Sequence, residues 1–263
     1  QTLFRQEDAG RPKAEAAAKT LHDLNGDCTI TTLFKVLDPQ NADDLVAQNT
    51  LVLDCADSFA VSYILSDSCL RHKVPLISAS VLGFTGYVGG FCGTAPSLRA
   101  VFPDLPDRAA TCATAGVMGP VVGLIGAAQA QMALGVMIGQ SPSPLGQVIS
   151  FDMQRFHSGG FRFDTAPEPE ADLRFIAAQQ IAPADFVVDL RGDDEAPQPV
   201  TPTAQRLTVA QFAAENPKPQ SGQRAVFACR SGLRAWNAAT HLRSYWDGDI
   251  SLIALGDTPE NER

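Results

Sequence analysis

A loop with a single cysteine, Cys229–Arg234 (CRSGLR), joins an apolar strand pattern at 225–228 directly to a helix pattern at 233–245. In this arrangement several backbone N–H groups and the N-terminus of the helix point at one sulfur atom. Such surroundings favour the thiolate, which is the nucleophilic form of cysteine. The alternative is an inert cysteine buried before a helix, and the neighbouring Arg230 and Arg234 argue against it. The loop therefore predicts a reactive sulfur at position 229.

The composition fits a folded chain of one large or two ordinary domains. It has 263 residues, of which 45% are hydrophobic, enough for a sizeable core. The formal net charge of −9 disfavours nonspecific binding to nucleic acid or to an anionic membrane, but does not exclude a nucleotide. The cysteines show no C-x-x-C spacing, which indicates reduced thiols in a cytoplasmic protein rather than a disulfide scaffold or a zinc site. They are Cys28, Cys55, Cys69, Cys92, Cys112 and Cys229.

Helix and strand patterns alternate along the chain, which predicts an α/β sheet with crossover connections. Helices are expected at 10–24, 43–48 and 58–70, and strands at 28–36, 50–55, 75–82 and 87–91. Pro12 is expected at the first position of its helix. The apolar run at 50–55 is typical of a parallel strand covered on both faces. Two late antiparallel strands are expected at 147–153 and 160–163.

The acidic, proline-bearing segment 164–172 has the composition of a linker. It divides the sequence into a first domain at 1–163 and a smaller α/β domain at 173–263.

A long uncharged stretch tests whether the chain enters a membrane. The segment from 109 to 151 contains no Asp, Glu, Lys or Arg, and its part 116–139 is long enough to span a bilayer. However, it is rich in glycine and alanine and contains Pro120, Gln129 and Gln131. A helix that is buried on every face, in a core or in a subunit interface, is therefore the preferred interpretation.

Acidic residues follow the apolar run 51–53, at Asp54 and Asp57. Ligands of open α/β sheets bind at the carboxyl ends of strands, so both carboxylates could face a metal–nucleotide. Asp57 or Ser58 is equally suited to cap the helix that follows. The fragment alone leaves both interpretations open.

Four segments occur in a characteristic order: QTLF at 1–4, DAGRPK at 8–13, LDCADS at 53–58 and TCATAGVMGP at 111–120. Together they resemble the ThiF/MoeB/HesA family of sulfur-carrier-protein adenylyltransferases, relatives of ubiquitin-activating enzymes. The resemblance covers about residues 1–163 and implies a Rossmann-like adenylation domain. It further implies that ATP and Mg²⁺ activate the Gly-Gly tail of a small ubiquitin-fold carrier, which then receives sulfur as a thiocarboxylate.

The resemblance also assigns roles to individual residues. Lys13 matches the phosphate-binding lysine, whose charge offsets that on the leaving phosphates. Asp57 matches the magnesium aspartate. Cys112 matches a loop cysteine that engages the carrier or relays sulfur, although a small apolar residue in a Gly/Ala segment remains an alternative there.

The second domain resembles rhodanese-type sulfurtransferases, which carry sulfur as a cysteine persulfide. Besides the cysteine loop, three features support this resemblance: FVVDLR at 186–191 is similar to the family's first core strand, Glu195 lies near its acidic position, and 250–255 followed by Gly256 is similar to its closing strand and turn. A cysteine phosphatase uses a similar anion-binding loop, but it places five residues between Cys and Arg, and here there are four. The resemblance implies that Cys229 carries the persulfide, and that Arg230, Arg234 and the loop amides stabilise its charge.

Three departures from the first family qualify these expectations. Its Gly-rich phosphate loop and ribose-binding acid lie upstream of Gln1, so the chain resembles the downstream part of such a domain. Many relatives bind zinc through two C-x-x-C pairs, but Ser97 and Ala100 stand at the first pair, so no zinc is expected. Thr114 replaces a common acidic residue after Cys112.

The sequence therefore predicts a cytoplasmic enzyme of thiamine or molybdopterin biosynthesis that adenylates a sulfur carrier and transfers sulfur to it. The expected partners are the carrier, an upstream cysteine-desulfurase-like donor and a second copy of the chain; nucleic acid and membrane are not expected. One alternative is a sulfurtransferase with a degenerate, non-catalytic carrier-binding scaffold. Another is a non-catalytic module that docks a ubiquitin-like partner.

Overall fold

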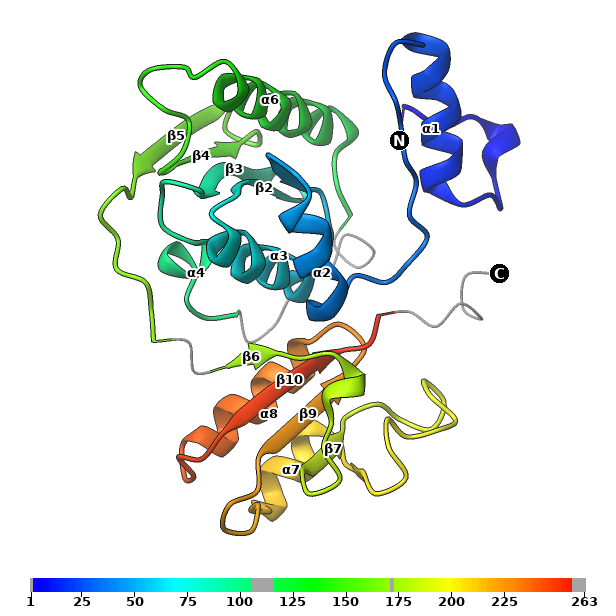
Figure 1. Ribbon diagram of the computed structural model, residues 1–263, viewed down its shortest axis with the longest axis vertical. Helices are drawn as coiled ribbons and strands as arrows, with labels where there is room; N and C mark the ends of the chain where they lie inside the picture. The colour runs from blue at the N-terminus through cyan, green and yellow to red at the C-terminus, as the bar shows by residue number, and fades with distance from the viewer. Residues whose placement is uncertain (1, 106–115, 171–172, 257–263) are drawn as a thin grey trace. The chain divides into compact units, whose positions relative to one another are not determined.

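The computed structural model describes residues 2–105, 116–170 and 173–256 (Figure 1). They form two compact units, one at 2–37 and one at 38–256. The second unit contains two five-stranded sheets, one on each side of the linker.

The first unit consists of a 3-10 turn, η1 (Gln6–Asp8), and one helix, α1 (Lys13–Leu24). The sequence predicts Pro12 as the first residue of this helix. Pro12 is instead its N-cap, so α1 begins one residue later, at Lys13. The strand predicted at 28–36 is wrong, because these residues form no strand and are exposed. A strand needs a neighbour to satisfy its backbone groups, and the described part of this unit offers none.

The first sheet has the strand order β1-β2-β3-β4-β5. Its strands are β1 (Val52–Asp54), β2 (Pro75–Leu82), β3 (Thr85–Cys92), β4 (Gln147–Asp152) and β5 (His157–Arg162). β1 pairs in parallel with β2, and every later pair is antiparallel. Thus the five strands that the sequence predicts for this sheet are confirmed, with small differences in their ends. They were predicted at 50–55, 75–82, 87–91, 147–153 and 160–163. β1 is not covered on both faces, because Leu53 is 44% exposed.

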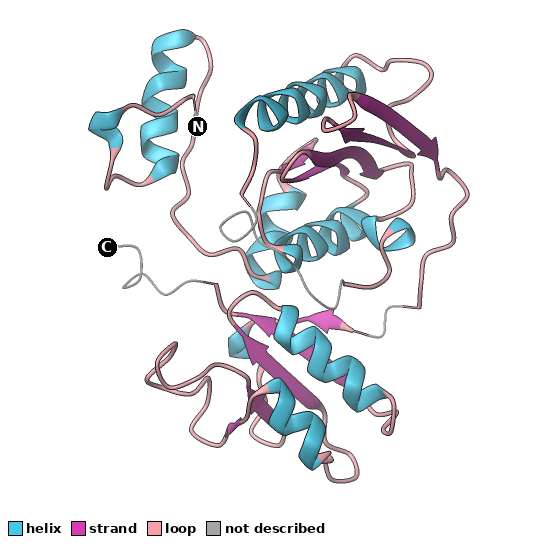
Figure 2. Cartoon of the chain, turned by 180° about the vertical axis from the view of Figure 1, so that it is seen from behind, coloured by secondary structure: helices cyan, strands magenta, loops and turns pink. Residues whose placement is uncertain are grey.

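Helices cover both faces of this sheet, as Figures 1 and 2 show. They are α2 (Pro39–Ala47), α3 (Phe59–His72), α4 (Leu98–Val101) and α6 (Gly119–Met137). On one face α3 contacts β1, β2 and β3 and is flanked by α2 and α4, while α6 contacts β2 and β3 on the other. Asp38 begins α2 by accepting N–H bonds from Gln40 and Asn41.

The sequence predicts that the long uncharged helix is buried on every face, and this prediction is wrong for α6. Val121, Ile125 and Met132 pack inward, whereas Leu134 and Met137 are 53% and 71% exposed. Among the described residues, α6 is the one helix whose length and apolar composition would suffice to cross a membrane. Of its most apolar 18-residue stretch, 33% is buried. Its packing on β2 and β3 favours a core helix with one uncovered apolar face. The predicted homodimer would cover that face and stays a prediction.

Gln129 ties α6 to the sheet. Its buried Nε2 donates to the backbone oxygens of Asp54 and Ile77, at 2.8 and 2.9 Å. Replacing Gln129 with leucine removes both bonds and leaves the carbonyls without this donor. We expect this change to lower the free energy of unfolding by about 1–3 kcal/mol in urea denaturation. The exposed Gln131 on the same helix is the control, and Gln131→Leu is expected to change stability little. Equal losses in both variants would contradict the role of Gln129.

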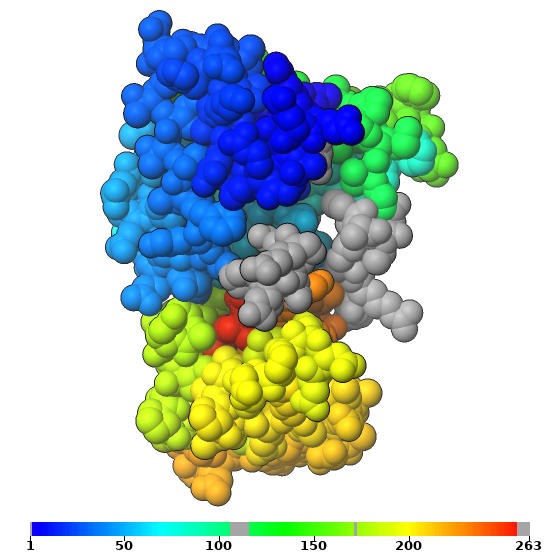
Figure 3. Space-filling model, turned by 90° about the vertical axis from the view of Figure 1, so that its right-hand side faces the viewer, coloured from blue at the N-terminus to red at the C-terminus, as the bar shows by residue number. Residues whose placement is uncertain are grey.

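The second sheet is entirely parallel and has the order β6-β10-β9-β7-β8. Its strands are β6 (Arg174–Phe175), β7 (Phe186–Asp189), β8 (Gln205–Arg206), β9 (Ala225–Cys229) and β10 (Ile250–Ala254). The turn η2 (Ala178–Gln180) and the helices α7 (Val209–Glu215) and α8 (Leu233–Arg243) complete it. The strand–loop–helix unit predicted around the cysteine is confirmed. The loop between β7 and β8, yellow in Figure 3, lies on the molecular surface.

Candidate functional site

The cysteine loop concentrates hydrogen-bond donors on one sulfur atom. β9 ends at Cys229, and Gly232 precedes α8 with a φ of 85°, a backbone conformation that favours glycine. The Cys229 Sγ accepts the N–H of Gly232 at 3.1 Å and that of Ala235 at 3.4 Å. The predicted convergence of backbone amides on position 229 is therefore confirmed, because the chain folds back around the sulfur at the start of α8.

The predicted preference of Cys229 for the thiolate is not what this arrangement gives. The residue is 0% exposed. Burial raises the pKa of its thiol above the ordinary value, although the N–H of Ala235, the guanidinium of Arg234 and the N–H of Gly232 act in the opposite direction. The protonated thiol therefore prevails at neutral pH while the sulfur stays covered.

The two arginines of the loop differ in their surroundings. Arg234 donates to Glu195 and to the backbone oxygen of Leu190, each at 2.8 Å. This pairing holds the pKa of the Glu195 carboxyl below its usual value. Arg230, the second residue of the loop, is exposed. Arg234 therefore has a fixed position beside the sulfur, while Arg230 is accessible to a ligand from solvent.

Asp189 and Arg191 brace the neighbouring loop. The carboxylate of Asp189 is 0% exposed and accepts bonds from the backbone N–H and guanidinium of Arg191 and from the N–H of Val200. Burial acts to raise the pKa of Asp189, but these hydrogen bonds outweigh it and lower the pKa below the ordinary value. The Asp-x-Arg motif seen in the sequence thus anchors the end of β7.

The lowered pKa of Asp189 predicts how stability depends on pH. The folded state binds the proton less tightly than the unfolded state, so the ionised carboxylate stabilises the fold above the unfolded pKa of about 3.9. This contribution is lost as the pH falls through the lower folded pKa. Asp189→Asn is expected to flatten the acid limb of the stability–pH curve, measured by urea unfolding from neutral pH downward. An unchanged acid limb would contradict the assignment.

Asp54 and Asp57, which the sequence places together after the first strand, have different roles. Asp54 is buried and accepts the Ser78 hydroxyl at 2.8 Å and the N–H of Ala56 at 3.1 Å, so it is a structural residue. Asp57 is exposed, just before α3. Ser58 is the N-cap of α3, but its side chain caps no N–H group. Helix capping therefore does not account for Asp57, which presents a carboxylate to solvent at the end of β1.

Two predicted site residues remain, Lys13 and Cys112. Lys13 is the exposed first residue of α1, in the first unit. Cys112 lies outside the described residues, as does Thr114.

One polar cluster was not predicted from the sequence, and it involves Ser97, the residue that stands in place of the first C-x-x-C pair in the sequence analysis. Glu168, in the linker, accepts the backbone N–H and the hydroxyl of Ser97 at 2.6 and 2.5 Å. Ser97 in turn caps α4. The sequence shows an acidic linker but not which carboxylate meets Ser97. In the described part of the chain no group of three His, Cys, Asp or Glu side chains could hold a metal. The absence of zinc stays a prediction.

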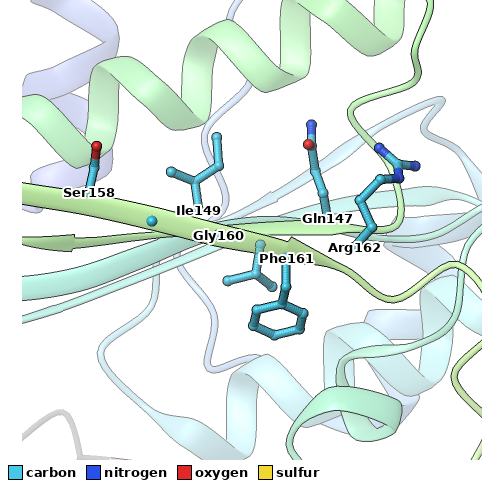
Figure 4. A pocket seen from close by; sticks show the side chains of 8 residues that line it. Gln147, Ile149, Ser158, Gly160, Phe161 and Arg162 are labelled. Atoms are coloured by element: carbon cyan, nitrogen blue, oxygen red, sulfur yellow. The ribbon is translucent and has the colours of Figure 1, made fainter.

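A shallow hollow of about 410 Å³ lies across β4 and β5 (Figure 4). Its cation, Arg162, is engaged by Asp164 and by the backbone oxygens of Ser143 and Leu145. None of the predicted site residues lines it, so we do not assign it to the active site.

Comparison with known sequences places the N-terminal two thirds of the chain in one group. The sequence profile of the ThiF family matches residues 1–173. The adenylyltransferase and sulfurtransferase MOCS3 of Drosophila ananassae is 35% identical over 155 residues, which are 58% of this chain and 34% of that protein. The sulfur carrier protein ThiS adenylyltransferase of Escherichia coli is 36% identical over 156 residues, 58% of this chain and 61% of that one. The match thus spans between about a third and three fifths of each of these relatives.

Among solved structures, the chain is similar to Escherichia coli MccB with ATP. The TM-score is 0.54 at 16% sequence identity, over 65% of this chain and 53% of that one. At this identity the similarity supports the adenylation fold and no particular substrate.

Proposed function

Because this chain belongs to the ThiF family, we propose that it activates the C-terminal carboxylate of a small sulfur carrier protein with ATP and then delivers sulfur to it from Cys229. Both halves of this activity appear in the name of the MOCS3 relative, and the first in that of the ThiS adenylyltransferase. The observation that carries the proposal is the amide-lined sulfur of Cys229, in the same chain as the ThiF-family segment.

In the first step, the carrier carboxylate attacks the α-phosphorus of ATP, and pyrophosphate leaves. Asp57 would hold the Mg²⁺ that accompanies the nucleotide, because its exposed carboxylate is the hard oxygen ligand that this ion prefers. Lys13 would offset the charge that develops on the leaving phosphates. The product is an acyl adenylate, whose carbonyl is open to a sulfur nucleophile.

In the second step, the C-terminal part acts as a rhodanese-like sulfurtransferase. The outer sulfur of a Cys229 persulfide attacks the adenylate carbonyl, and AMP leaves. The carrier is then joined to Cys229 by an acyl disulfide. A second thiol, for which Cys112 is the candidate, attacks the Cys229 Sγ and releases the carrier thiocarboxylate. An external thiol reductant then reduces the Cys112–Cys229 disulfide to two free thiols and is itself oxidised, and a cysteine-desulfurase-like donor reloads Cys229 as a persulfide.

The chemistry of the loop supports this role for Cys229. Two N–H groups and the Arg234 guanidinium oppose the effect of burial on the pKa, so they stabilise negative charge on sulfur. A persulfide ionises more readily than a thiol and places its outer sulfur one bond farther out. Linkage of the two activities in one chain raises the effective concentration of the sulfur donor near the adenylate.

ATP–pyrophosphate exchange tests the proposal. The purified protein is expected to catalyse exchange only when a sulfur carrier with a Gly-Gly tail is added, from either the thiamine or the molybdopterin route. Persulfide-loaded protein is then expected to convert that carrier to its thiocarboxylate, seen as a mass increase. No exchange with carriers of either route would refute the adenylation half.

The second candidate is a sulfurtransferase whose ThiF-family part is a degenerate scaffold. The hydrogen-bonded Ser97–Glu168 pair, at the position where the family resemblance leads one to expect a C-x-x-C pair, favours it. This alternative predicts thiosulfate:cyanide sulfurtransferase activity that Cys229→Ala abolishes and that Asp57→Ala leaves unchanged, without carrier-dependent exchange.

A further inference from the structure

The cysteine loop packs against the first turn of α3. Gly232 lies so close to this turn that a Cβ added to it would be 2.8 Å from the Cβ of Ala60. On the second sheet the same added atom would be 2.9 Å from a ring carbon of Phe175. Ala60 and Cys229 are both 0% exposed. The loop is therefore closed between α3 and β6, with its sulfur inside.

A second contact joins the same two helices one turn farther on. The rings of Tyr63 on α3 and Trp236 on α8 lie 5.7 Å apart between centroids. The Arg99 guanidinium lies 4.5 Å from the Tyr63 ring and 5.9 Å from the Trp236 ring. Asp67 holds Arg99 in place through two hydrogen bonds, at 2.7 and 2.9 Å. All three stacked side chains are buried, so the contact excludes water.

The two contacts follow one helical spacing. Ala60 and Tyr63 are three residues apart on α3, and Gly232 and Trp236 are four apart at the start of α8, so each pair occupies one helix face. A movement of α8 that carries Gly232 away from Ala60 also breaks the stack of Trp236 on Tyr63. Access to the sulfur and the Trp236 stack are therefore linked.

We propose that α3 is a cover for Cys229, and that separation of Trp236 from Tyr63 and Arg99 opens the cysteine loop to sulfur donors and acceptors. Only the need for opening rests on the proposed function, because in sulfur transfer a donor persulfide must reach the Cys229 sulfur, which is buried in this structure. Asp57 lies three residues before Ala60, just ahead of the same helix. A ligand bound at Asp57 would therefore lie next to the turn of α3 that covers Cys229.

Alkylation of individual cysteines tests the cover without any turnover. The protein is treated with iodoacetamide, and the rate at each cysteine is followed by peptide mass spectrometry. In the protein without substitutions, Cys229 is expected to react much more slowly than the exposed Cys28. Ala60→Phe places a ring where the loop packs, and Trp236→Leu removes the stack while keeping α8 apolar. Each is expected to raise the alkylation rate of Cys229 at least tenfold. Leu70→Phe, at an exposed position of α3, is the matched control and is expected to have no effect.

Cys69 and Cys92 report whether a variant has simply unfolded, because both are buried in the first sheet and its helices. Selective reaction at Cys229, with Cys69 and Cys92 still protected, supports the cover. An equal increase in the alkylation rate of all three cysteines would contradict it. Rapid alkylation of Cys229 in the protein without substitutions would contradict it as well. Unchanged protection of Cys229 in both Ala60→Phe and Trp236→Leu would also overturn it. These outcomes are independent of ATP and carrier, so failure of the cover and failure of the proposed function are distinguishable.

Discussion

Replacing Cys229 with serine is expected to abolish sulfur transfer to the carrier while leaving ATP–pyrophosphate exchange intact. Serine is close in size to cysteine and can accept hydrogen bonds from the same N–H groups. Its hydroxyl oxygen cannot form a persulfide, so it cannot carry the sulfur that is transferred. The loss is expected to reach the uncatalysed background. Mass spectrometry of the protein after incubation with a sulfur donor, and of the carrier after turnover, measures both parts of the prediction.

The control for this prediction is Cys28→Ser, which removes an exposed cysteine of the first unit. It is expected to retain both activities. Persulfide loading that survives in Cys229→Ser would show that another cysteine carries the sulfur. Loss of exchange together with sulfur transfer would instead indicate that the substitution disturbs the first sheet through the contact between the cysteine loop and α3.

Asp57→Asn is expected to reduce carrier-dependent ATP–pyrophosphate exchange by about a hundredfold or more, because the neutral amide binds Mg²⁺ weakly and stabilises less charge in the transition state. Asp57 is exposed, so its replacement is expected to change the free energy of unfolding by no more than about 0.5 kcal/mol. The loss of exchange is thus separated from loss of fold by urea denaturation of the same variant.

Asp44→Asn serves as the matched change, because Asp44 is an exposed carboxylate on the neighbouring helix α2. It is expected to keep full exchange activity. Comparable losses in Asp44→Asn and Asp57→Asn would point to a general effect of charge and would count against a specific magnesium ligand. Thiosulfate:cyanide activity is expected to be the same in both variants and in the unmodified protein.

The elements that the sequence predicts well are those with strong local signals. The helix pattern at 58–70 became α3, and the apolar segments at 75–82 and 225–228 became β2 and β9. The cysteine loop was predictable for the same reason, because Gly232 and the following helix dictate how the backbone turns around the sulfur. Asp189 and Arg191 lie two residues apart, so their pairing is also local.

The predictions that failed depend on neighbours distant in the sequence. The segment 28–36 has the composition of a strand, but no described strand of its unit pairs with it. The apolar helix α6 covers one face of a sheet, and its other face is left exposed, which composition cannot indicate. No local sequence signal singles out Arg99 or Glu168, because their partners, Tyr63 and Ser97, are distant in the sequence.

By itself the sequence determined the α/β class, the ThiF-family segment and the cysteine loop with its converging amides, because each rests on residues close together in the chain. Only the tertiary structure decided that Asp54 is structural while Asp57 is exposed, and that the Cys229 sulfur is closed against α3 with a raised pKa. Exposure and pKa depend on what packs over a group, and here the groups that pack over Cys229 include Ala60, far away in the sequence.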